Sequence, residues 1–178
     1  MKTRWLCFML LFVAGSVTAG QIDIRETRVW LQGERYLLDA DLVYQLDDSI
    51  MEALDNGIPV VFSISVVVEE TSLLSAQLAS DRLDYRIRFR PLTAFYEVTG
   101  PEGSRRSFVT RAAMFAYLGE LREIPLVDAS MLDKSASYRY RMKAELDIES
   151  LPLPMRPMAW FSPVWNLSSG WEEWSLSP

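Results

Sequence analysis

Residues 138–149 alternate strictly between apolar and charged side chains, and prolines follow directly after them. Successive side chains of a strand point to opposite faces, so this alternation predicts a β-strand with one buried and one solvated face. At about 3.3 Å per residue the strand would extend roughly 40 Å, and we expect it to bend or to pass from one sheet to another. Proline cannot donate a ladder hydrogen bond, so pairing should stop at an extended connector containing Pro152, Pro154 and Pro157. The apolar face would carry Tyr138, Tyr140, Met142, Ala144, Leu146 and Ile148.

Residues 1–19 have the parts of a secretory signal peptide. Two basic residues precede an apolar run over residues 5–14, and small residues follow it. This run is too short for a comfortable membrane span. We therefore expect a periplasmic mature domain over residues 20–178; an uncleaved signal would instead anchor the protein in the inner membrane.

Composition restricts the chemistry of the mature domain. The chain has no His, and Cys7, its one Cys, lies in the expected signal. Disulfides, a Ser-His-Asp triad, a Cys nucleophile and a His/Cys zinc site are thereby excluded after cleavage. We expect no cofactor and no metal. The net charge is −6 for the whole chain and becomes −8 when Lys2 and Arg4 leave with the signal (16 basic against 24 acidic residues), so the mature domain has no general attraction to nucleic acid.

Strand patterns separated by turn signals predict one mainly β domain. We expect an antiparallel β-sandwich or strongly bent sheet of about seven to nine strands, with two short helices packed on it. Strands are expected in a hairpin over 21–46 that turns at Gly33, in 58–70, in a hairpin over 84–100, and in 136–149 and 170–176.

Two helices and one connector complete the expected elements. A short helix should follow Asp47 or Asp48 as its N-cap. The second, within residues 107–124, would pack a stripe of apolar residues on the sheet. Residues 71–83 are polar and helix-compatible, and we interpret them as a connector. The stripe of the second helix comprises Phe108, Ala112, Phe115, Leu118 and Leu121.

The segments "YRMKAELDIESLPLPMRP" and "WNLSSGWEEW" resemble an uncharacterised proteobacterial family of exported proteins, the domain of unknown function 4390. The hairpin "YRIRFRPLTAFYEV" and the segment "FAYLGELREIPLV" resemble it more weakly. The resemblance implies export in a Gram-negative bacterium and implies no reaction. Its most specific residues are Leu146, Asp147, Leu151, Pro152, Pro154, Arg156 and Pro157, to which we assign a structural role.

Two stripes of basic residues are candidates for a binding surface. Arg86 and Arg88 lie on one strand pattern, and Arg139 and Arg141 on another. If the two strands are neighbours, the stripes would form a cationic patch for an acidic partner or for anionic lipid headgroups. The alternative is a solvated face neutralised by carboxylates across the strands.

The C-terminal tail is rich in tryptophan. Indole rings favour sites with one apolar and one wet end, such as interfaces and membrane surfaces. The alternative is a tail that folds back as a last strand, so that its tryptophans close the core. The candidates are Trp160, Trp165, Trp171 and Trp174.

Carboxylates are the remaining acid–base groups. A glycosidase needs two of them about 5 to 9 Å apart in a cleft. Asp39 and Asp41, on one face of a predicted strand, could meet that distance, as many surface pairs do.

These features favour a non-enzymatic periplasmic interaction module that binds an envelope or inner-membrane protein. One alternative is a carrier that holds a lipid or a small apolar ligand between its sheets. The other is a carboxylate-based hydrolase of cell-wall glycan.

Overall fold

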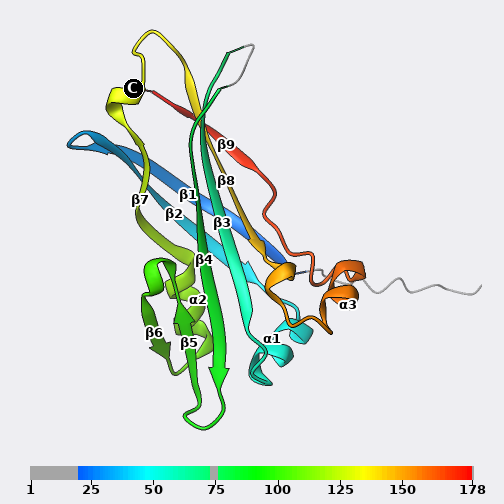
Figure 1. Ribbon diagram of the computed structural model, residues 1–178. Coiled ribbons are helices and arrows are strands. Elements are labelled where there is room, and N and C mark those ends of the chain that lie inside the picture. Colours follow the sequence, from blue (N-terminus) through cyan, green and yellow to red (C-terminus); the bar gives the residue numbers. More distant parts are fainter. Residues whose placement is uncertain (1–19, 73–75, 178) are drawn as a thin grey trace, which may run out of the picture.

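The computed structural model describes residues 20–72 and 76–177. The expected signal peptide and residues 73–75 of the expected connector lie outside these ranges. The described chain forms nine strands and three α-helices (Figure 1). The strands are β1 (Gln21–Gln32), β2 (Arg35–Gln45), β3 (Val60–Glu70), β4 (Gln77–Arg90), β5 (Phe95–Thr99), β6 (Arg105–Phe108), β7 (Glu120–Asp128), β8 (Tyr138–Leu146) and β9 (Glu172–Leu176). The helices are α1 (Asp48–Asp55), α2 (Arg111–Gly119) and α3 (Arg156–Phe161).

The strands form two antiparallel sheets, as the mainly β prediction requires. The smaller has the order β1-β2-β7 and the larger the order β6-β5-β4-β3-β8-β9. Figure 1 shows the β1–β2 hairpin behind the large sheet and oblique to it. β7 contacts β3 and β4, and β1 contacts β8, so the sheets pack face to face as a sandwich.

The inner faces of the two sheets share one hydrophobic core. Alternate residues of β3 and β8 point into it, among them Phe62, Ile64, Met142 and Ala144, each at most 1% exposed. Opposite them lie Leu38 and other residues of β2. A cross-sheet hydrogen bond of 2.8 Å joins the hydroxyls of Thr27 and Tyr140 at the margin of this core.

The first hairpin and the first helix confirm their sequence signals. Gly33 adopts φ +63° at the β1–β2 turn, a conformation that favours glycine. The Asp47 carboxylate accepts the Ser49 backbone N–H at 2.9 Å and caps α1. A hydrogen bond from the Ser49 hydroxyl at 2.7 Å, together with this N–H bond, holds the Asp47 pKa below its usual value.

A cluster of hydrogen bonds and an ion pair connects α1 and α2 to the large sheet. The Tyr96 hydroxyl on β5 donates to Asp55 of α1 at 2.8 Å, and the Arg111 Nε of α2 donates to that hydroxyl at 3.1 Å. Arg111 also forms an ion pair with Asp55. The cluster therefore connects three elements that are distant in the sequence.

Three local expectations were wrong. The described part of the expected 71–83 connector is mostly strand, because β4 begins at Gln77 and pairs along β3 as far as Glu69. β8 is nine residues long and stays in one sheet, since it ends at Leu146. The proline segment after it is not extended throughout: it contains a third helix, α3, with Pro157 in its first turn.

The second helix is shorter than its apolar spacing predicted. α2 ends at Gly119 and β7 begins at the next residue. Phe108 lies in β6, Leu121 lies in β7 and Ala112 is exposed. The buried face of α2 consists of Met114, Leu118 and Gly119.

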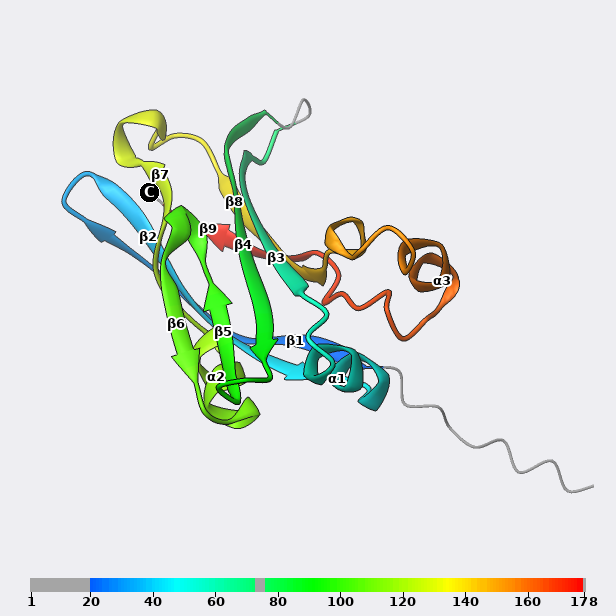
Figure 2. The same ribbon diagram turned by 60° about the horizontal axis from the view of Figure 1, so that its bottom comes forward.

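One end of the sandwich, which we call the α3 end, collects several elements. Here β2 ends, β3 begins and β8 stops, as the pairings of Gln21 with Gln45 and of Phe62 with Leu146 show. α1 and α3 lie at this end (Figures 1 and 2). The opposite end contains the β1–β2 and β7–β8 turns and the end of β9.

A hydrogen-bonded cluster crosses the outer face of the large sheet near the α3 end. Ser63, fully buried on β3, donates to Asp84 of β4 at 2.6 Å. Arg82 pairs with Asp84 and Asp147, each at 3.0 Å. Although partial burial raises the pKa of Asp84, the bonds from Ser63 and Arg82 outweigh it and hold this pKa below its usual value.

This cluster predicts a pH-dependent contribution to stability. A carboxylate with a depressed folded-state pKa stabilises the protein above its unfolded pKa of about 4, and this contribution is lost as pH falls through the folded pKa. Asp84→Asn should therefore destabilise the protein at neutral pH, and the difference from wild type should shrink below about pH 4. Urea unfolding at several pH values measures this difference in stability. In Ser63→Ala, which removes one hydrogen-bond donor to Asp84, the free energy of unfolding should depend less on pH than in wild type. A difference that is constant with pH would contradict the assignment.

Candidate functional site

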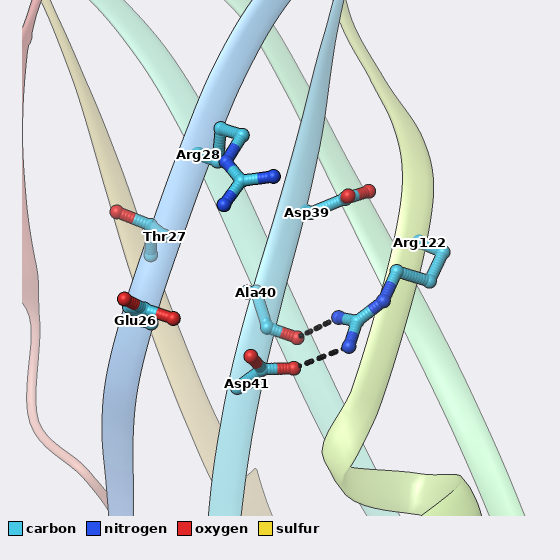
Figure 3. A pocket seen from close by; sticks show the side chains of 7 residues that line it. All are labelled: Glu26, Thr27, Arg28, Asp39, Ala40, Asp41 and Arg122. Atoms are coloured by element: carbon cyan, nitrogen blue, oxygen red, sulfur yellow. Dashed lines mark hydrogen bonds and ion pairs between the residues drawn. The ribbon is translucent and has the colours of Figure 1, made fainter.

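A shallow hollow of about 210 Å³ lies on the outer face of the small sheet (Figure 3). Cross-strand pairing places Glu26 opposite Asp41, and Arg28 opposite Asp39. Arg122 approaches from β7. The hollow thus brings the two predicted carboxylates together with two arginines.

An irregularity in the β2–β7 pairing shapes this hollow. The register shifts between Leu38 and Ala40, and Glu123 takes φ +56° there. The Glu123 backbone N–H donates to Asp39 at 2.9 Å. Arg122 pairs with Asp41 at 2.6 Å, and this hydrogen bond raises the arginine pKa.

Both carboxylates already have partners within the protein, so the hollow is a polar surface whose charged groups interact with one another and with the backbone of β7. The sequence pattern indicated Asp39 and Asp41 but missed Arg28 and Arg122. No signal could identify Arg122, because its position depends on the irregular pairing of β7.

The two arginine stripes lie on the same outer face of the large sheet but do not merge. β3 separates β4 from β8. Arg86 pairs opposite Val61 near the start of β3, whereas Arg141 pairs opposite Val67 near its end. The stripes therefore occupy opposite ends of one face.

The stripe on β8 is engaged within the protein. Arg139 and Arg141 pair with Glu69 at 2.9 and 3.1 Å. The Arg141 guanidinium also lies 4.7 Å from the centre of the Trp171 ring. These contacts agree, for β8, with the alternative in which carboxylates of the same chain neutralise the basic residues.

The stripe on β4 is more open. Arg86 and Arg88 are exposed, and neither has an ion-pair partner within residues 20–72 and 76–177. Glu97, which faces Arg88 across the β4–β5 pair, pairs with Arg90 at 3.0 Å. Arg86 and Arg88 are thus available to an external partner.

The four candidate tryptophans have different environments. Trp165 is buried, and Trp174 stacks on Tyr140 with ring centres 5.2 Å apart. The predicted last strand exists as β9, which brings Trp174 to the core. Trp171 is 43% exposed beneath Arg141, whereas Trp160 on α3 is 62% exposed.

The residues that carry the family resemblance build the turn between β8 and α3. Leu146 and Leu151 are buried. The Asp147 side chain accepts the Glu149 backbone N–H at 3.0 Å and turns the chain away from β8. The Arg156 Nε donates to the Leu151 carbonyl at 2.8 Å. Pro152 and Pro154 lie between these two residues in the sequence, and Pro157 follows them.

Large apolar side chains next to Trp160 are also exposed, which the sequence pattern did not predict. Leu153, Met158 and Phe161 are 73%, 66% and 90% exposed. A sequence signal for this exposure exists: residues 156–161 carry apolar side chains on all sides, and a short helix cannot bury every side against one sheet. We call Leu151–Phe161 the α3 segment.

The described residues contain neither a membrane-spanning helix nor a metal-binding cluster. None of their helices is long and apolar enough to cross a membrane. No group of three or more His, Cys, Asp or Glu residues in the same ranges is arranged to hold a metal ion.

Comparisons with known proteins identify a family without an assigned activity. A family model described as "Domain of unknown function (DUF4390)" matches residues 19–175. No curated protein and no solved structure matches significantly.

Proposed function

The chain belongs to the DUF4390 family, and from this premise we propose that it is an exported, non-enzymatic interaction module of the bacterial cell envelope. Its mature domain works in the periplasm, next to the inner membrane, and binds an envelope protein. The signal-like residues 1–19 support export.

The open arginine stripe carries the proposal. Over most of the large sheet's outer face, basic residues pair with carboxylates of the same chain, as Arg82, Arg139 and Lys143 do. Arg86 and Arg88, and Arg105 in line with Arg86 across β5, depart from this pattern among the described residues. Exposed guanidinium groups that form no ion pair with the described residues suit an acidic surface of another protein, since arginine forms bidentate bonds with carboxylates.

The alternatives have less support. A carrier needs space between its sheets, but buried side chains from both inner faces contact one another there. A hydrolase needs its acid pair in a cleft, whereas Asp39 and Asp41 lie in a shallow hollow and already accept hydrogen bonds from β7.

Affinity purification from detergent-solubilised envelopes tests the proposal. The full chain is produced with a tag at its C-terminus, and protein and lipid in the eluate are read by mass spectrometry. We expect one envelope protein in near-stoichiometric amount. Arg86→Glu with Arg88→Glu should reduce its recovery at least about ten-fold, because charge reversal at a complementary patch repels the partner.

The matched control is Lys134→Glu, an exposed basic residue between β7 and β8 at the opposite end of the sandwich. It should leave recovery unchanged. A bound apolar molecule with no protein would favour the carrier, and release of fragments from labelled cell wall, lost in Asp41→Asn, would favour the hydrolase. Either result would contradict the proposal.

A further inference from the structure

We propose that the α3 segment inserts its exposed apolar side chains into the interfacial layer of a phospholipid membrane, so that the module rests on the bilayer by its α3 end. This inference rests on the proposed export to the envelope. It assigns a surface, and a ligand chemistry, distinct from the arginine stripe.

The α3 segment presents a second apolar face that nothing in the described structure covers. One side packs on the core through Leu151 and Ala159, both 1% exposed. The other side carries Leu153, Met158, Trp160 and Phe161. Tryptophan and phenylalanine are the side chains typical of an interfacial helix.

The segment is held rigidly. Arg156 donates to the Leu151 carbonyl at 2.8 Å, and the buried Leu151 and Ala159 anchor the start and the later part of the α3 segment on the core. Three prolines restrict its backbone further. The exposed side chains are therefore presented in a fixed arrangement, and less conformational entropy is lost when they bind.

The described chain begins at the α3 end. Gly20, the first described residue, lies against Leu167. Leu167 accepts the Leu146 backbone N–H at 2.9 Å, and Leu146 leads directly to the turn before α3. Gly20, the described residue that follows the expected signal in the sequence, thus lies at the α3 end. If the apolar run at residues 5–14 stays in the inner membrane, it holds this end of the domain at the bilayer.

Charge at the segment matches a phospholipid headgroup. A hollow of about 500 Å³ is lined by Glu149, Arg156, Pro157, Trp160 and Phe161. A guanidinium and a carboxylate beside two aromatic rings complement the phosphate and the ammonium of phosphatidylethanolamine. The occupant we assign is therefore a phospholipid surface and not a protein.

Vesicle flotation tests the inference. Protein processed from the full chain is purified and floated with vesicles of phosphatidylethanolamine and phosphatidylglycerol. Wild type should float. Trp160→Ser with Phe161→Ser should lower the partition coefficient at least about ten-fold, since two large apolar side chains no longer enter the interface. Both positions are exposed, so the variant should keep the wild-type unfolding midpoint.

The matched control is Leu31→Ser with Met131→Ser, two residues that are each 50% exposed at the opposite end. It should float like wild type. The inference is wrong if wild type stays at the bottom of the gradient, or if the α3 variant floats as well as wild type. If the α3 variant instead loses a co-purifying envelope protein and floats normally, the segment is a protein site. Flotation that fails while wild type still captures an envelope protein would refute this inference and leave the proposed function standing.

Discussion

Phe62→Ala is expected to lower the free energy of unfolding by about 3 to 5 kcal/mol, the range for removing a large aromatic side chain from a core. Phe62 is 1% exposed on the central strand β3. It lies between Tyr85 and Leu146 of the neighbouring strands. Its ring also meets that of Tyr44, from the other sheet, edge to face at 5.0 Å. The substitution therefore leaves a cavity where the two sheets meet.

Urea unfolding measures the loss, with Val67→Ala as the control. Val67 is on the same strand but is partly exposed on the outer face. Its truncation should cost about 1 kcal/mol or less. Equal losses for the two variants would contradict the placement of Phe62 between the sheets.

Gly119→Ala should destabilise the protein by about 3 kcal/mol, at the upper end of the usual range for overpacking. A Cβ atom at this position would overlap the backbone carbonyl oxygen of Leu42 on β2. That atom belongs to a paired strand, so it cannot move aside as a flexible side chain would. Relief would require α2 to shift away from the small sheet.

Thermal or urea unfolding of Gly119→Ala beside Ala116→Ser tests this prediction. Ala116 is exposed on the same helix, and its substitution should cost less than about 1 kcal/mol. Wild-type stability for Gly119→Ala would show that α2 does not approach β2 as closely as described.

Sequence patterns were sufficient where a segment has one buried face and clear end signals. The alternation in β8, the apolar run of β3, the Gly33 turn and the Asp47 cap each predicted its element. The outcome at Gly119 depends on tertiary contact. Local spacing allowed the helix to continue, but Gly119 lets it end against Leu42 so that β7 can pair with β2.

The start of β4 illustrates a different limit. Around Ser80, Asp81 and Arg82 the strand is exposed, so its sequence lacks a buried period. Its structure comes from pairing with Val66 and Val67 of β3, which is a nonlocal interaction. β8 stops early for a local reason, because Asp147 turns the chain through its bond to the Glu149 N–H.

The candidate site was predictable by residue type and not by arrangement. The stripes and tryptophans were identified from the sequence. The sequence could not show that Glu69 forms ion pairs with Arg139 and Arg141. It also could not show that Trp174 is half-buried while Trp160 is exposed. Strand order decides the first of these, and the C-terminal fold decides the second.

Site-specific photocrosslinking in cells tests membrane placement most directly. A benzophenone amino acid replaces Trp160 in one full-length chain and Leu31 in another, and adducts are identified after irradiation of intact cells. We expect phospholipid adducts at position 160 and few or none at position 31. Adducts at 160 with protein alone, or equal lipid labelling at both positions, would contradict it.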